Sequence, residues 1–262
     1  MRSALILCCG LMLYGQTVQE WIQEGAAAYK AAQYDEAVEN FKQAAAADPK
    51  SVQARLYLAT AYLAIFYSGP QDDDKLRNTL QAFDQVLELD PRNRHAVSTL
   101  AALGMRRPEA DQARQWQLRL LEIDPNNKEA HFALGVIAWS KFAPAYQAAR
   151  ARAGLKAGDP GPFKDAKLRS AMRGEWEPVL QDGIQHLQRA VELDPRYDDA
   201  MTYLNLLIRS RADFADNPYA YQAQMVKAET WVKKALEIKK RKGNAAAAPA
   251  LSIAAPPLPE TP

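Results

Sequence analysis

Cysteine is scarce in this 262-residue sequence, which holds only Cys8 and Cys9, side by side near its start. Beyond them, neither a disulfide framework nor a thiolate metal site can form. An excess of one charge is also lacking, because 33 Lys and Arg stand against 31 Asp and Glu, a formal net charge of +2. Such a balance gives no strong attraction to nucleic acid, so we expect no nucleic-acid partner.

Motifs that carry chemistry are absent as well. The three histidines, His95, His131 and His186, have no Cys, His or carboxylate at the spacing of a metal site. The stretch GLKAGDPG lacks the GK[ST] ending of a phosphate-binding loop, and no G-x-S-x-G motif occurs. The sequence therefore predicts a protein that is not an enzyme and holds neither metal nor cofactor.

A hydrophobic run long enough to span a membrane is missing too. Residues 1–15 read MRSALILCCGLMLYG, with Arg2 before a short apolar run and Gly15 where a signal peptidase could cut. This pattern predicts a signal peptide over 1–15 and a periplasmic or secreted protein without a membrane span after its removal. A buried first helix or a membrane anchor is the alternative. A lipid anchor is not favoured, because Leu7 stands before Cys8 where a small residue is expected.

What the sequence does have is a recurring Asp-Pro pair after an Ala- or Leu-rich helical run. Pro91 and Pro125 are 34 residues apart, Pro49 and Pro91 are 42 apart, and Pro125 and Pro195 are 70 apart. A period of 34 residues with two insertions is typical of stacked helical hairpins. Proline cannot continue a helix but can open the next turn, so each pair is expected to end one hairpin and start another.

The segment GAAAYKAAQYDEAVENFKQAAAADP and, further on, GIQHLQRAVELDP carry Gly, Tyr, Ala, Phe and Pro at spacings that resemble the tetratricopeptide repeat family. The resemblance implies an all-α, right-handed superhelical solenoid of about five helical hairpins over residues 17–242, with a helical insertion in the fourth. The last 20 residues, 243–262, are Ala- and Pro-rich with almost no charge, which predicts a disordered tail.

Two insertions interrupt the period. In the second unit, FYSGPQDDDKLRN predicts a turn-rich acidic loop between helices. In the fourth, residues 143–178 place a GDPGP turn between Ala-, Lys- and Arg-rich flanks, which predicts a protruding hairpin of two solvent-exposed helices. Alternatively, Asp159-Pro160 ends a further repeat, giving six units. The predicted contact residues of this insertion are Arg150, Arg152, Lys167 and Arg169.

Because the first helices of such hairpins line a concave groove, the resemblance also implies which side chains face it. They are Ile22, Ala26, Tyr29, Lys30, Leu56, Leu63, His95, Met105, Arg106, Phe132, Val136, Trp139 and Arg209. We expect a scaffold or adaptor that binds a protein or peptide in this groove, in the bacterial periplasm or cell envelope. One alternative is an envelope assembly factor whose basic hairpin contacts membrane or polysaccharide. Another is that Phe132 and Trp139 only pack beneath the insertion.

Overall fold

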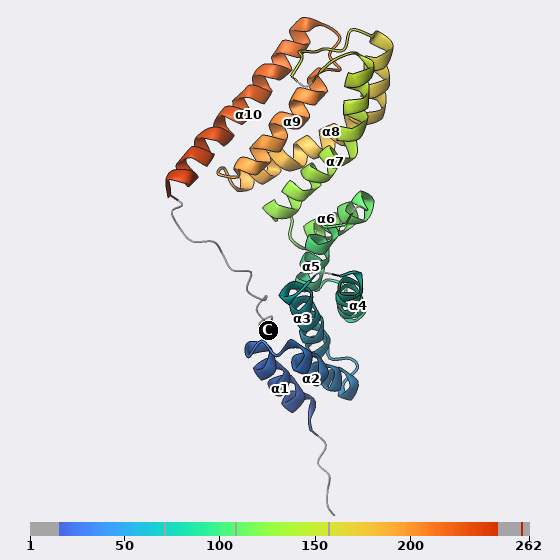
Figure 1. Ribbon diagram of the computed structural model, residues 1–262, viewed down its shortest axis with the longest axis vertical. Coiled ribbons are helices and arrows are strands. Elements are labelled where there is room, and N and C mark those ends of the chain that lie inside the picture. The colour runs from blue at the N-terminus through green and yellow to red at the C-terminus, as the bar shows by residue number, and fades with distance from the viewer. Residues whose placement is uncertain (1–15, 71, 108, 157, 246–257, 259–262) are drawn as a thin grey trace, which may run out of the picture. The chain divides into compact units, whose positions relative to one another are not determined.

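The computed structural model describes residues 16–70, 72–107, 109–156, 158–245 and 258. These residues form ten helices and no strand. The helices are α1 Val18–Lys30, α2 Tyr34–Ala47, α3 Val52–Ser68, α4 Asp73–Leu89, α5 Arg94–Gly104, α6 Ala110–Ile123, α7 Lys128–Arg152, α8 Ala166–Leu193, α9 Asp198–Ala212 and α10 Pro218–Ala245 (Figure 1). They pair in chain order as five hairpins, as the repeat pattern predicts. The six-unit alternative is wrong, because Asp159 and Pro160 lie in the connection between α7 and α8, inside one hairpin.

The Asp-Pro pairs mark the junctions between hairpins. In each, the aspartate caps the C-terminus of a helix and its backbone N–H donates to the carbonyl four residues earlier. These caps are Asp48, Asp90, Asp124 and Asp194. The side chain of Asp48 also accepts from the N–H of Lys50 at 3.0 Å, and Ser51 then caps α3. Aspartate thus closes the turn, and the proline after it prevents the helix from continuing.

The insertion in the second unit does not form the acidic loop that the sequence predicts. Helix α3 continues to Ser68, and Asp72 already caps α4, accepting from the N–H of Lys75 at 2.7 Å. Asp73 and Asp74 lie in the first turn of α4. The prediction was wrong because carboxylates stabilise the positive end of a helix, so the acidic run begins a helix rather than filling a loop. The extra residues lengthen both helices to 17 residues.

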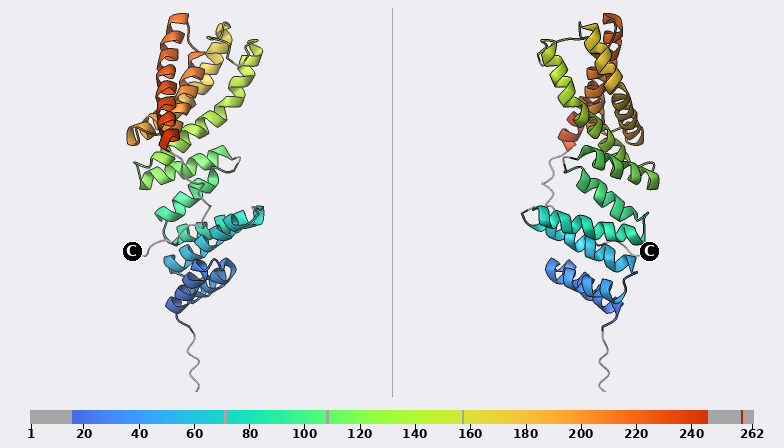
Figure 2. Two further views of the ribbon diagram at one scale, coloured as in Figure 1. Left: turned by 60° about the vertical axis from the view of Figure 1, so that its left-hand side comes forward. Right: turned by 90° about the vertical axis from the view of Figure 1, so that its right-hand side faces the viewer.

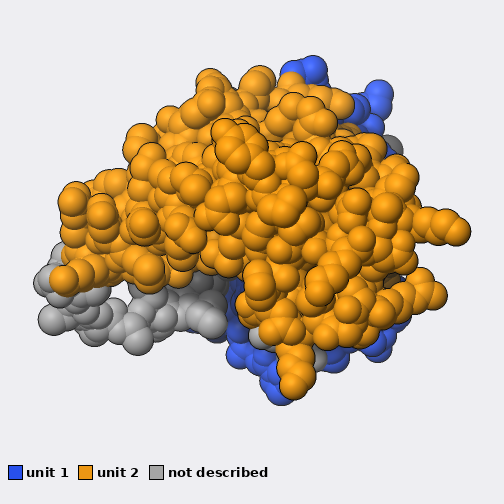
Figure 3. All heavy atoms as spheres, turned by 90° about the horizontal axis from the view of Figure 1, so that it is seen from above, with its two compact units in different colours: residues 1–96, 252–262 blue, residues 97–251 orange. Residues whose placement is uncertain are grey.

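The chain divides into two compact units, residues 1–96 with 252–262 (unit 1) and residues 97–251 (unit 2) (Figure 3). Unit 1 contains α1–α4. Its core shows why small residues recur in the repeat: a Cβ on Gly25 would lie 2.5 Å from Cε1 of Phe41. Ala37, Phe41 and Ala44 are fully buried. Gly25 therefore lets α1 and α2 approach each other closely.

Unit 2 is built around the long helices of the fourth hairpin. Helix α7 has 25 residues and α8 has 28, with Pro144 and Pro178 inside them. Figure 2 shows α7–α10 together, and α7 packs on α8 and α9, α8 on α9, and α9 on α10. The large side chains that are fully buried here include Phe142, Phe163, Leu180, Leu187, Leu204 and Phe214.

The insertion is therefore part of this core. Within residues 143–178, Ala149, Phe163 and Met172 are buried in one cluster with Phe214. The insertion does contribute to two helices, α7 and α8, but the prediction that both are solvent-exposed is wrong. The insertion has few large apolar residues, but those few meet at one place, the chain segment that follows α9. Their burial removes apolar surface from water, which favours the packing of the extended helices against α9.

Two glycines of α8 predict opposite effects of one substitution. A Cβ on Gly183 would lie 2.5 Å from Cβ of Ala138, whereas a Cβ on Gly174 would have nothing within 4 Å. Gly183→Ala should therefore lower the free energy of unfolding by about 1–3 kcal/mol through overpacking. Gly174→Ala should raise it by about 0.5–1 kcal/mol, because alanine favours the helix. Urea unfolding measures both. Changes of the same sign would contradict the close approach of α7 and α8.

Among the described residues no helix is both long and apolar enough to cross a membrane. The predicted signal peptide lies outside the described residues, as does most of the predicted tail. Helix α10 ends at Ala245. Within the tail, Leu258 is described: it is half-buried and packs against the core cluster of unit 1.

Candidate functional site

A cleft of about 530 Å³ lies in unit 2 between the inserted part of the fourth hairpin and the last two helices. We call it the insertion cleft. Its lining residues come from α7, the connection between α7 and α8, α9 and its C-terminal end, and α10. They are Trp139, Tyr146, Gln147, Arg150, Ala151, Leu155, Gly158, Asp159, Pro160, Leu206, Arg209, Ser210, Asp213, Tyr221 and Met225. A cleft of this size holds a few side chains of a peptide.

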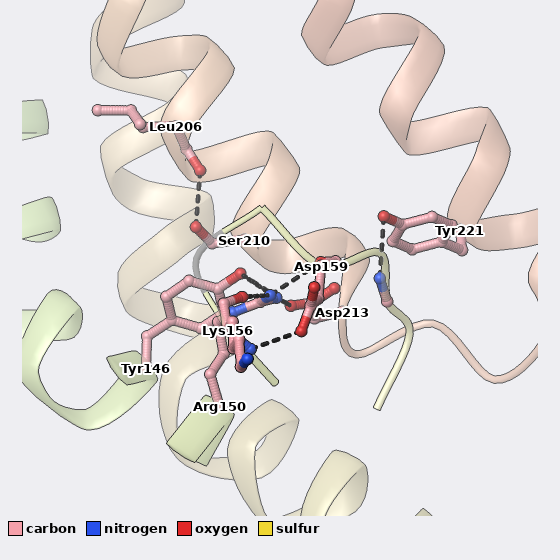
Figure 4. A network of polar contacts seen from close by, with 9 residues as sticks. Tyr146, Arg150, Lys156, Asp159, Leu206, Ser210, Asp213 and Tyr221 are labelled. Carbon is pink, nitrogen blue, oxygen red and sulfur yellow. Dashed lines mark hydrogen bonds and ion pairs between the residues drawn. The ribbon is translucent and has the colours of Figure 1, made fainter. Parts of the chain in front are cut away.

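One side of the cleft is held by a buried carboxylate, Asp213, which follows the last residue of α9 and is 2% exposed. Figure 4 shows Tyr146 and Arg150, both on α7, pointing at it. The Arg150 guanidinium donates to Oδ2 of Asp213 at 2.6 Å, and the Tyr146 hydroxyl donates to the same oxygen at 2.8 Å. The Arg150 side chain is only 13% exposed, so this ion pair is largely shielded from water.

The same arginine fixes the connection between α7 and α8. Its second terminal nitrogen donates to the carbonyls of Lys156 and Asp159, each at 2.8 Å. Two backbone groups of the same connection bind residues outside it. The N–H of Phe163 donates to the carbonyl of Asp213 at 3.0 Å, and the N–H of Gly161 donates to the hydroxyl of Tyr221 at 3.1 Å. These bonds fix the position of the connection between α7 and α8, so that it forms one wall of the cleft.

The electrostatics of this network follow from its burial. Burial raises the pKa of Asp213, while hydrogen bonds and charge from Tyr146 and Arg150 act in the opposite direction. Burial and the neighbouring Asp213 raise the pKa of Tyr146 well above its ordinary value. The tyrosine is therefore a hydrogen-bond donor at neutral pH. Both donors are used within the protein, so a ligand must be held by other residues of the cleft.

Two of the residues predicted for the groove meet in this cleft. Trp139 on α7 is half-buried and Arg209 on α9 is exposed, and both line it. Phe132 does not, because its ring packs on Tyr197 and Tyr203, with centroids 4.9 and 5.6 Å away. Met105, Arg106 and Val136 lie elsewhere in unit 2.

In unit 1, Tyr29 and Leu63 are buried core residues, so their predicted exposure to a groove is wrong. The ring of Tyr29 packs against Tyr34 at 5.3 Å. Lys30 is exposed. His95 is half-buried, and burial lowers its pKa.

The predicted contact residues of the insertion divide in two. Arg150 and Arg169 make internal bonds, and Arg169 donates to the carbonyl of Phe163 at 2.6 Å. The prediction that Arg150 is a surface contact is wrong, because it pairs with Asp213, which follows the end of α9. Arg152 and Lys167 are exposed.

Sequence reasoning missed Tyr146, Asp213 and Tyr221. One signal was available: Phe142, Tyr146 and Arg150 follow one another at intervals of four, and so share one face of α7. It also missed that His131 and His186 meet, with their Nδ1 atoms 2.9 Å apart. Burial lowers the pKa of His186. Among the described residues there is no group of three or more His, Cys, Asp or Glu that could hold a metal ion.

Comparison with known proteins supports the repeat. Residues 22–65 and 75–128 match the tetratricopeptide repeat family. No curated protein sequence matches the chain. Among solved structures, a MamA protein is 15% identical with a TM-score of 0.58, covering 89% of this chain and 98% of its own. MamA from Desulfovibrio magneticus RS-1 is 14% identical with a TM-score of 0.55, covering 87% and 98%.

YrrB, described as a TPR protein with an unusual peptide-binding site, is 15% identical with a TM-score of 0.54, covering 85% of this chain and 87% of its own. At these identities the likeness shows the fold alone.

Proposed function

Because the chain is a tetratricopeptide repeat protein, we propose that it is a protein-interaction scaffold that binds an extended segment of a partner in the insertion cleft. The observation that carries the proposal is the meeting of Trp139 and Arg209 in one cleft. They come from α7 and α9, the first helices of consecutive hairpins. First helices form the inner surface of such repeats, where ligands bind.

The chemistry of the cleft describes the partner. Leu155, Leu206 and Met225 give it apolar walls. Trp139 offers a broad apolar face for a side chain of the partner, of the kind that dominates binding energy in interfaces. Arg209 adds an exposed positive charge at the same cleft, and a guanidinium binds carboxylates well. The segment that fits best is apolar with an acidic residue nearby.

The display of random peptides on phage tests this assignment. Peptides selected on the unmodified protein should bind Trp139→Ala about 30-fold more weakly, because a hot-spot aromatic contributes about 2 kcal/mol or more. Arg209→Ala should weaken those that contain an acidic residue. Tyr219→Ala is the matched control, since Tyr219 is 87% exposed on α10 and does not line the cleft. Selected peptides that bind all three variants equally would contradict the proposed site.

We also propose that the protein acts in the bacterial periplasm. The support is the sequence of residues 1–15, with Arg2, a short apolar run and Gly15. Sequencing the N-terminus of protein from a periplasmic extract should then give a start near Gln16 or Thr17. Full-length protein recovered from the cytoplasm would contradict this location.

Contact with a membrane or polysaccharide through a basic hairpin has less support. Three of the basic side chains of the insertion make internal contacts: Arg150 with Asp213, Arg169 with the carbonyl of Phe163, and Arg173 with Asp216.

A further inference from the structure

Leu258 stands apart from the other apolar residues packed on the core of unit 1. The partly buried members around this core are Val18, Trp21, Ala26, Tyr34, Tyr62, Ile65 and Leu258. All but Leu258 belong to α1, α2 or α3, whereas Leu258 comes thirteen positions after Ala245, the last residue of α10. An apolar side chain in an isolated coil segment would be exposed. Leu258 is half-buried, so the helices of unit 1 cover part of it.

The surface that receives Leu258 is apolar and belongs to the first two hairpins. Leu258 packs against the core cluster of unit 1, whose buried members lie on α1, α2 and α3. These helices belong to consecutive hairpins, and stacked helical repeats bind ligands on the extended concave surface that the stacking creates. Unit 1 thus presents a second apolar surface, separate in the chain from the insertion cleft of unit 2.

The sequence around Leu258 suits it as a ligand. It reads Ala-Pro-Pro-Leu-Pro-Glu over residues 255–260. Proline favours extended conformations in peptides, so a proline-rich sequence loses little entropy when it binds along a groove. A single leucine between prolines offers one apolar anchor, with no neighbouring large side chain to compete with it.

We infer that the segment around Leu258 is an intramolecular ligand of unit 1, and that the surface formed by α1–α3 recognises a proline-flanked leucine. A partner that presents a similar segment has to displace it. The inference does not depend on the function proposed for the insertion cleft, because it concerns other helices and another observation.

A peptide-binding experiment on the full-length chain tests this. The probe is a fluorescent peptide of residues 254–262, AAPPLPETP, followed by anisotropy. Leu258→Asp should release the intramolecular segment and free the surface, so this variant should bind the peptide at least about tenfold more tightly than the unmodified chain, in which the tethered segment competes at high effective concentration. Leu251→Asp is the matched control: it places the same charge in the same tail and should behave like the unmodified chain.

Two further measurements keep the outcomes distinct. A peptide carrying a photoreactive leucine at position 258 should crosslink to α1–α3 of the Leu258→Asp variant; crosslinks to α7–α10 would overturn the inference.

Sedimentation should show that the oligomeric state does not depend on Leu258. If the unmodified chain is a dimer and Leu258→Asp is a monomer, the occupant is the tail of a second copy and the intramolecular assignment is wrong. Equal peptide binding by the unmodified chain and Leu258→Asp would also overturn it.

Discussion

Asp213→Asn is expected to lower the free energy of unfolding by about 3 kcal/mol, because it leaves the guanidinium of Arg150 without its charged partner in a site that water hardly reaches. The Arg150 side chain is 13% exposed and that of Asp213 is 3% exposed. The carboxylate also accepts from Tyr146 at 2.8 Å. A neutral amide weakens both bonds, and urea unfolding measures the loss.

Asp216→Asn is the control for this experiment. Asp216 pairs with Arg173 at 2.8 Å, but its side chain is 70% exposed, so its loss should cost less than about 1 kcal/mol. Hydrogen exchange of Asp213→Asn should show faster exchange in the connection between α7 and α8, which Arg150 holds through the carbonyls of Lys156 and Asp159. If Asp213→Asn loses no more unfolding free energy than Asp216→Asn, and hydrogen exchange in the connection is unchanged, then the contacts of Asp213 with Arg150 and Tyr146 do not anchor the insertion.

Phe163→Ala is expected to cost about 3–5 kcal/mol, the range for removing a large aromatic side chain from a packed core. Phe163 is fully buried although it lies in a connection, and its ring centroid is 6.3 Å from that of Phe214 and 6.4 Å from that of Tyr146. Thermal or urea unfolding gives the change.

Two other variants separate packing from nonspecific effects. Phe163→Leu retains much of the apolar volume and should lose clearly less stability than Phe163→Ala. Tyr219→Ala removes an aromatic that is 87% exposed and should change stability by less than about 0.5 kcal/mol. If Phe163→Ala cost no more than Tyr219→Ala, the insertion would protrude from the core, as the sequence alone suggested.

The hairpins could be predicted from the sequence because the signals that form them are local. The backbone N–H of an aspartate such as Asp48 donates to the carbonyl of Ala44 at the helix end, and its side chain accepts from the N–H of Lys50. All three residues lie within one short stretch. Gly25 and Phe41 are also close in sequence, within the first hairpin, and they pack against each other. The residues that recur with the repeat period are therefore also the residues that pack the helices together.

The packing of the insertion could not be predicted in that way. Phe142, Phe163 and Phe214 come together from α7, a connection and the segment after α9, and no periodicity links them. Arg150 could be counted as a surface charge because its partner Asp213 is 63 positions away. Trp139 and Arg209 were predicted from their places in the repeat, whereas Tyr221 joins the cleft only because the connection folds back onto α10.

Hydrogen exchange of the chain with and without a bound peptide or partner segment tests the central claim most directly. If the insertion cleft is the binding site, the ligand should slow exchange in α7 near Trp139, in the connection around Asp159 and in α9 near Arg209, the elements that line the cleft. The same ligand should cause no such change in Trp139→Ala. Slowed exchange confined to other helices, with these three segments unchanged, would contradict the account.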